Sequence, residues 1–248
     1  MKLALILLFI LQSLTANASD IYRTKLMSVC ASLLRNHSSQ KDFEDIFLDG
    51  KVSRRGGLCG PTCMVNSSFA VERIAGLSIK KNTMERMTIL KNLHDNNRAN
   101  VNMPFGSGGF SWHYPAQFVE FLKHLGLPEP KVDDYEMGSS GGPSTELDLS
   151  KLLNILSGKQ LANAMPLISV TSFDHSNQHG GHFVMVSGHN TARRRILIID
   201  PNDPWIEQSV TYQIRDNRVV LTRDGPLEYV RNEKHETLLI DYAAVFEF

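Results

Sequence analysis

The pattern of apolar residues changes once along this sequence, near Pro166, and this change limits the folds open to the chain. Before Pro166 the apolar residues recur with helical period, and after it short β-branched or alternating runs are separated by turn residues. The expected helices are 20–35, 61–74, 83–94, 115–125 and 145–156, and the expected strands are 167–172, 182–188, 196–200, 210–214, 219–222 and 238–246. This order predicts an α+β fold in which a helical front packs against an antiparallel β-sheet.

The N-terminus has the features of an export signal. Lys2 is followed by an apolar run over residues 3–11 and by the small-residue cleavage site Ala16-Asn17-Ala18. The run is too short to cross a bilayer, and no later segment reaches about 18 uninterrupted apolar residues. We therefore expect residues 1–18 to be removed. Residues 19–248 are then expected to form one exported domain, periplasmic or secreted, without membrane insertion.

The charge of the chain limits the partners it can bind, and its cysteine content limits how its core can be stabilised. Lys plus Arg and Asp plus Glu both number 26, so no net charge attracts the chain to nucleic acid, and we expect no nucleic-acid partner. The three cysteines are too few for a fold held together by disulfides. Because they are so few, apolar packing must supply the core. Their odd number leaves at least one thiol free or paired between molecules.

Cys59 is the strongest candidate for a reactive group. It lies in the segment 57–63 (GLCGPTC), a turn that opens directly into the expected helix 61–74. Helix N-termini carry partial positive charge and unpaired N–H groups, which favour a thiolate and can hold an oxyanion. A thiol at this position is therefore expected to be activated.

Two later segments supply the partners that a nucleophilic thiol needs. The segment 180–186 (GGHFVMV) contains His182 and the segment 196–201 (ILIIDP) contains Asp200, each at the edge of a strand-like run. A sheet can hold such an imidazole and carboxylate rigidly against the thiol. The CGPT helix opening, the GHFVxV strand and the Asp-Pro strand end together resemble the papain-like cysteine peptidases. Within these, the chain is most similar to the leader peptidases of bacteriocin-exporting transporters and their stand-alone relatives.

This resemblance extends over roughly residues 50–205 and implies a papain-like fold, with the nucleophile helix packed on the sheet. It implies that Cys59 is the nucleophile, His182 the general base and Asp200 the group that orients the imidazole. It further implies a peptide or protein substrate and no cofactor. Nothing in the sequence resembles the membrane or nucleotide-binding regions of the transporter-fused relatives, so bacteriocin leader processing is not implied.

Cys63 is a rival nucleophile, because some papain relatives use the second cysteine of a Cys-x-x-Cys opening that precedes an aromatic residue. Here the spacer is three residues and Met64 follows. Cys63 should lie one helical turn below Cys59, on nearly the same face. We therefore expect it to pack in the core or to form a disulfide with Cys30.

One departure from the family pattern concerns the oxyanion. The resemblance places a glutamine about six residues before the nucleophile, where this sequence has Ser53, and Gln40 lies nineteen residues upstream. The backbone N–H of Cys59 supplies one donor, and either Ser53 or Gln40 could supply another. The departure leaves open a catalytically inactive, papain-like binding module. The same three groups also serve transglutaminases and amidases, and the sequence does not discriminate these activities.

The histidines at 175, 179 and 182 have a spacing that could bind zinc or copper. However, glycines and polar residues predict a loop there, and no adjacent glutamate completes a zinc-peptidase motif. We expect no metal, and interpret the segment as a rim facing the substrate. Residues 112–114 (WHY) could line the cleft or anchor a helix start, and Arg193-Arg194-Arg195 is expected to be a solvated hairpin turn.

Overall fold

The computed structural model describes residues 21–47, 58–96, 105, 114–136, 145–146, 149–157, 164–174, 177–190, 192–215, 218–221 and 237–248. The expected export signal, residues 1–18, lies outside this range. So do Ser53, Trp112, His113 and His175. No helix within the described part of the chain is long and apolar enough to cross a membrane.

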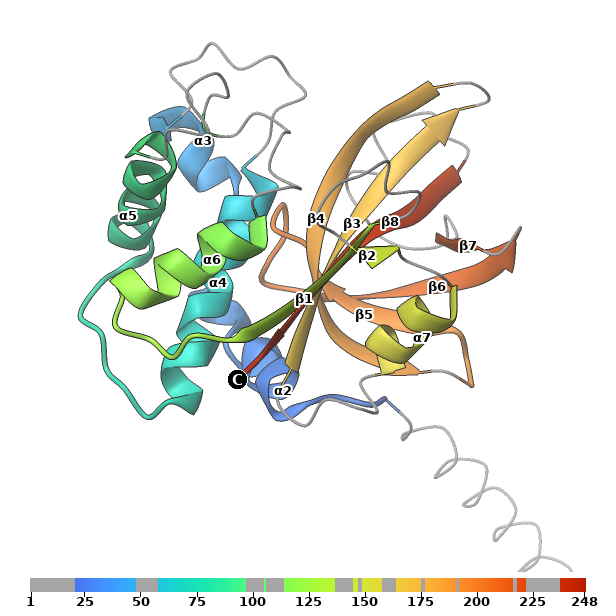
Figure 1. The fold of residues 1–248 in the computed structure, drawn as a ribbon, viewed down its shortest axis with the longest axis horizontal. Helices are drawn as coiled ribbons and strands as arrows, with labels where there is room; N and C mark the ends of the chain where they lie inside the picture. Colours follow the sequence, from blue (N-terminus) through green and yellow to red (C-terminus); the bar gives the residue numbers. More distant parts are fainter. Residues whose placement is uncertain are drawn as a thin grey trace, which may run out of the picture.

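The described elements follow the expected order of helices first and strands second, except that two strands precede the last helix (Figure 1). The helices are α2 (Lys25–Ser32), the 3-10 helix η1 (Leu34–Asn36), α3 (Lys41–Phe47), α4 (Cys59–Ile74), α5 (Thr83–Asn96), α6 (Tyr114–His124) and α7 (Leu149–Ser157). The strands are β1 (Lys131–Glu136), β2 (Thr145–Glu146), β3 (Ala164–Asp174), β4 (Asn177–Asn190), β5 (Arg195–Ile199), β6 (Glu207–Arg215), β7 (Arg218–Leu221) and β8 (Thr237–Glu247).

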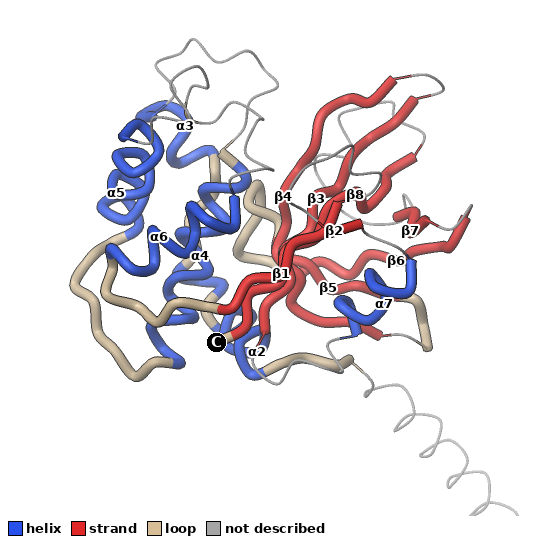
Figure 2. The backbone as a smooth tube through the Cα atoms, viewed as in Figure 1, coloured by secondary structure: helices blue, strands red, loops and turns tan. Residues whose placement is uncertain are grey.

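The strands form one sheet that curls into a barrel. Their order is β2-β1-β8-β3-β4-β5-β6-β7, and a further pairing between β7 and β8 closes the ring. The pairings are antiparallel apart from that of β1 with the short β2. Figure 2 shows the helices α3 to α6 gathered on one side of these strands. The expected α+β fold with an antiparallel sheet is therefore confirmed.

Alternate residues of the central strands contribute to two apolar cores. On β4, Phe183 and Met185 pack with the helices α2, α4, α5 and α6, whereas Val184 and Val186 point into the barrel. The barrel core also contains residues of β3, β5, β6, β7 and β8, and α7 covers it through Leu152 and Ile155. The sheet is thus buried on both faces where it meets the helices.

Several elements differ from the sequence-based expectations. The expected helix 145–156 begins only at Leu149, because Thr145–Glu146 pairs with β1 as the strand β2. The strand β1 was not expected, since its sequence KVDDYE has no apolar alternation. Antiparallel pairing with β8 along its whole length holds it instead. The helix α3 was not expected either, and Phe43 supplies its buried contact.

The cysteines do not form disulfides. Cys30, Cys59 and Cys63 are all free and buried. The Cys30 thiol donates to Met165 Sδ at 3.6 Å, and the Cys63 thiol donates to the Phe183 carbonyl at 3.6 Å. Both belong to the helix-side core. Of the two expectations for Cys63, core packing is therefore correct and the disulfide with Cys30 is wrong, because each sulfur has another partner.

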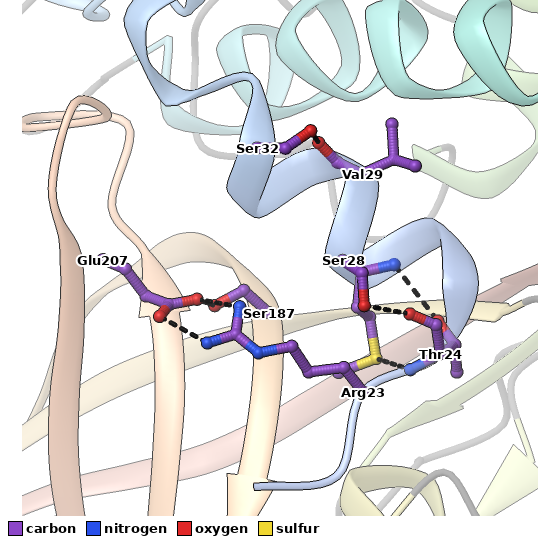
Figure 3. Close-up of polar contacts among 8 residues, drawn as sticks. Arg23, Thr24, Ser28, Val29, Ser32, Ser187 and Glu207 are labelled. Carbon is purple, nitrogen blue, oxygen red and sulfur yellow. Dashed lines mark hydrogen bonds and ion pairs between the residues drawn. The ribbon is translucent and has the colours of Figure 1, made fainter.

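The segment that leads into α2 is fastened to the sheet (Figure 3). Tyr22 exchanges two backbone hydrogen bonds with His189 of β4, at 2.7 and 3.0 Å. Arg23 donates through both Nη atoms to the Glu207 carboxylate at 2.5 and 2.6 Å, and Ser187 Oγ donates to Glu207 Oε1 at 2.6 Å. Thr24 accepts the Met27 N–H and so caps the helix.

Residues 37–40 form a strap between α4 and the turn that follows β5. On one side, Asn66 of α4 accepts the Ser38 N–H at 3.1 Å and donates to the Ser38 carbonyl at 2.9 Å. On the other side, the Gln40 N–H donates to the Pro201 carbonyl at 2.8 Å, and Ser39 Oγ donates to the Asn202 carbonyl at 3.1 Å. The strap therefore fixes the distance between α4 and the end of β5.

We expect Asn66→Ala to destabilise the fold by about 2–4 kcal/mol, because it removes two hydrogen bonds and leaves both polar groups of the Ser38 backbone unpaired. Ser32→Ala is the matched control. It also removes a side-chain bond to a backbone carbonyl, that of Val29, but at an exposed position, so it should change stability by less than about 0.5 kcal/mol. Urea unfolding of both variants measures the difference, and equal effects would contradict a structural role of the strap.

Candidate active site

Cys59 is the first residue of α4, as the helix opening predicts. Pro61 is tolerated in this first turn because its nitrogen would have no acceptor within the helix. The Thr62 N–H closes the first helical bond, to the Leu58 carbonyl at 2.8 Å. The N–H groups of Gly60 and Phe183 both donate to the Cys59 sulfur. Backbone donors from the helix start and from β4 therefore converge on this thiol.

The pairing of β4 with β5 brings His182 and Asp200 together. Met185 of β4 lies opposite Ile199, the last residue of β5. Asp200, which follows Ile199, is therefore level with Val184, two positions from His182. Residues so related lie on the same face of a sheet and are within side-chain reach. The His182 Nε2 atom lies 2.8 Å from Asp200 Oδ1, and the two residues are 4% and 0% exposed. The structure thus joins the two predicted residues by a direct hydrogen bond.

His182 also meets the thiol. Its side chain forms a hydrogen bond with Cys59. The helix α4, which begins with Cys59, packs against the strand β4, which contains His182. Figure 1 shows the helix and the strand. Because Nε2 is held by Asp200, Nδ1 is the nitrogen that faces the sulfur. The three residues predicted from the sequence therefore form one line, from thiol to imidazole to carboxylate.

The pKa values of Cys59 and His182 are shifted in opposite directions, and both shifts favour the charged form of the group. Burial favours the neutral thiol, but hydrogen bonding and attraction to His182, together with the two N–H donors, outweigh it and lower the pKa of Cys59 below 9.0. Burial likewise favours neutral imidazole, yet the charges and hydrogen bonds of Asp200 and Cys59 raise the pKa of His182 to about 10. Both shifts favour a thiolate–imidazolium pair at neutral pH.

Asp200 and Cys63 complete the electrostatic environment. Burial alone would raise the pKa of Asp200, but the charge of His182 and its hydrogen bond, with those of Asn202, lower it, so Asp200 stays ionised. The pKa of Cys63 is raised well above 9.0 by burial and then by the charges of Cys59 and Asp200. Cys63 is therefore a poor nucleophile at neutral pH.

Sequence reasoning did not single out Asn202. Its N–H donates to Asp200 Oδ1 at 2.8 Å, and its amide nitrogen lies 3.4 Å from His182 Nε2. The signal was present in the sequence, because an aspartate commonly accepts from the backbone N–H two residues further on.

The side-chain donor for an oxyanion is not assigned by the described residues. Ser53 lies outside them. Gln40, the second candidate, donates through Nε2 to Glu44 at 3.2 Å and is attached by its backbone to Pro201, on the carboxylate side of the site. The donors that the structure places beside Cys59 are backbone N–H groups.

The remaining candidates lie apart from this line. His179 belongs to β4, and Tyr114 begins α6. The loop expected around His179 is therefore wrong from Asn177 onward, because this segment pairs with β3. Among the described residues, no group of three metal-ligating side chains is present. Arg193 and Arg194 occupy the exposed turn between β4 and β5, and the exposed Arg195 begins β5, as expected of a solvated hairpin.

A helix that opens on a buried cysteine, packed on an antiparallel sheet that carries a histidine and an aspartate, defines the papain-like class of cysteine peptidase folds. Comparison with known families gives the narrower assignment. The model of the Peptidase_C39 like family matches residues 36–220, and the chain belongs to that family. This membership supports a hydrolase of the cysteine peptidase type. No curated protein matches the chain.

The pKa shifts predict selective alkylation. At pH 6, iodoacetamide should modify Cys59, whereas burial raises the pKa of Cys30 to about 12 and keeps Cys63 protonated, so neither should react. Peptide mass mapping identifies the modified residue. In His182→Ala the onset of modification should move up towards the ordinary thiol range, since the cation that stabilises the thiolate is lost. Modification of wild-type Cys59 that begins only near pH 8.5 would contradict the ion pair.

Proposed function

We propose that the protein is an exported cysteine peptidase that hydrolyses peptide bonds in a peptide or protein substrate, with Cys59, His182 and Asp200 as its catalytic residues. One observation carries the proposal: the Cys59 thiol and the Asp200 carboxylate contact the same imidazole from opposite sides. That arrangement activates a thiol without a metal or an organic cofactor.

In the first half of the reaction the Cys59 thiolate attacks the carbonyl carbon of the substrate. The negative charge that develops on the carbonyl oxygen is stabilised by N–H groups at the start of α4. His182 then gives its Nδ1 proton to the departing amine as the C–N bond breaks. The products of this half are a free amine and a thioester between the acyl group and Cys59.

In the second half a water molecule attacks the thioester. His182, now neutral, takes a proton from the water through Nδ1 as the new C–O bond forms. The C–S bond breaks, the carboxylic acid leaves, and the thiolate–imidazolium pair is restored. Throughout, Asp200 keeps the Nε2 proton in place and so fixes the tautomer that leaves Nδ1 able to exchange protons.

Export is part of the proposal and rests on the sequence. The charged start, the apolar run and the small-residue site at Ala16-Asn17-Ala18 are typical of a cleaved signal. The described fold begins at Ile21, and the segment from Tyr22 is fastened to β4 and β6. Cleavage after Ala18 would leave this fastening intact. The proposed mature domain is therefore residues 19–248.

Cys59→Ala should abolish hydrolysis of a fluorogenic peptide library, by at least about a thousandfold, because it removes the nucleophile. The fold should survive, since a small side chain at the helix start leaves little space unfilled. Cys63→Ala is the matched control: it removes the same atom one turn deeper, in the core, and should lower the unfolding temperature while most activity remains. The reverse pattern in well-folded variants would make Cys63 the nucleophile.

The same assay separates hydrolysis from transglutamination. Transfer of the acyl group to an added amine, in place of hydrolysis, would indicate a transglutaminase.

The two substitutions at Asp200 should differ in effect. Asp200→Asn keeps an oxygen that accepts the Nε2 proton and should lower kcat less than Cys59→Ala does. Asp200→Ala removes the acceptor and should lower kcat further. Measurements of kcat on one peptide substrate, with circular dichroism to confirm folding, give the order. Equal kcat values for Asp200→Ala and wild type would show that the carboxylate does not orient the imidazole.

A further inference from the structure

Asn202 contacts both members of the imidazole–carboxylate pair. Its backbone N–H donates to Asp200 Oδ1 at 2.8 Å, and its side-chain amide also hydrogen-bonds to the Asp200 carboxylate. The same amide nitrogen lies 3.4 Å from His182 Nε2. Asn202 is thus the neighbour of the Asp200–His182 bond on the side of the turn after β5.

The backbone of Asn202 is held in this position from the opposite direction. Ser39 Oγ donates to the Asn202 carbonyl at 3.1 Å, and the Gln40 N–H donates to the preceding Pro201 carbonyl at 2.8 Å. Both donors belong to the strap 37–40, which Asn66 fastens to α4. The amide of Asn202 therefore projects from a fixed turn.

The two oxygens of the Asp200 carboxylate differ in their hydrogen bonds, so the orientation of the carboxylate depends on the donors to one of them. Oδ1 accepts from His182 and from Asn202, whereas Oδ2 is buried and has no hydrogen-bond partner among the described residues. Rotation of the carboxylate about its Cβ–Cγ bond would move Oδ1 away from Nε2 and break the aligned hydrogen bond. Donors that bind Oδ1 from the side of Asn202 oppose this rotation.

We propose that Asn202 is a positioning residue for the peptidase site, whose backbone and side-chain N–H groups hold the Asp200 carboxylate ionised and aligned with His182 Nε2. The inference rests on the proposed function, since it gives Asn202 a part in activating Cys59. Asn202 acts through Asp200 and does not touch the reacting atoms.

The surrounding charges set the direction of the effect. Asp200 is faced by His182 from β4, by Cys63 from α4, and by the uncharged Asn202 from its own turn. Loss of the amide donor weakens the stabilisation of the ionised carboxylate, and hence its hold on the imidazolium. The thiolate then loses part of its partner, so the pH at which Cys59 becomes reactive should rise.

A double-mutant cycle tests this coupling. Asn202→Ala should lower kcat/KM about tenfold in the otherwise wild-type enzyme, as expected for loss of a hydrogen bond to a charged group. In the Asp200→Ala background the same substitution should change kcat/KM by less than about twofold, because no carboxylate is left to position. An equal loss in both backgrounds would overturn the proposal.

Asn202→Asp separates hydrogen-bond donation from packing. The new side chain has nearly the size of the old one, but its carboxylate cannot donate when ionised and repels Asp200. It should therefore lower kcat/KM more than Asn202→Ala does, whereas a packing role predicts the opposite order. Asp203→Ala, in the same turn, is the matched control and should stay within about twofold of wild type. Thermal unfolding of each variant confirms that it is folded.

The pH dependence of Cys59 alkylation by iodoacetamide tests the inference without any substrate. Its onset should move to higher pH in Asn202→Ala and further in Asn202→Asp. A lower kcat/KM with an unchanged alkylation profile would place Asn202 in contact with substrate and overturn the positioning role. Failure of the wild-type enzyme to hydrolyse any peptide would instead contradict the proposed function, and the alkylation profiles would still decide the role of Asn202.

Discussion

The hydrogen bond between Cys59 and His182 is the interaction on which the proposed chemistry depends, because its two partners come from different layers of the fold. The helix α4 supplies the thiol and the strand β4 supplies the imidazole. Each layer has its own core, and Phe183 and Met185 extend from β4 into the core on the helical side. The packing that stabilises the domain is thus also the packing that sets the distance between the thiol and the imidazole.

Burial of three ionisable groups in one line is costly, and the structure offsets this cost with donors and charges. Cys59 receives N–H groups from both layers, His182 lies between two acceptors, and Asp200 is bonded by the turn that follows it. Removal of one partner leaves the others buried without compensation. For this reason the site has to be considered as a unit, from the helix start to the strap 37–40.

Much of the fold and the site could be predicted from the sequence, and the exceptions have physical causes. Cys59, His182 and Asp200 were identifiable because a helix opening and two strand ends have local signatures, and strand pairing does bring the last two together. The strand β1 has no such signature, since backbone pairing with the distant β8 holds a mostly polar segment. Asn202 has a local signature for its backbone bond to Asp200, but none for the position of its side chain. Its contact with His182 depends on a strap whose contacts lie far from it in sequence.

The strand β8 also has a consequence for how the chain reaches its folded state. It pairs with β1, with β3 and with β7, so that Lys131 lies opposite Glu247 and Val220 lies opposite Leu239. Until β8 is available, β1 has no antiparallel partner and the barrel is open between β3 and β7. Contacts this distant in sequence form slowly, because the entropy of closing a long loop is lost before the contact is gained. The helix α4 can therefore form early, while the sheet that positions His182 and Asp200 is completed only when β8 is in place.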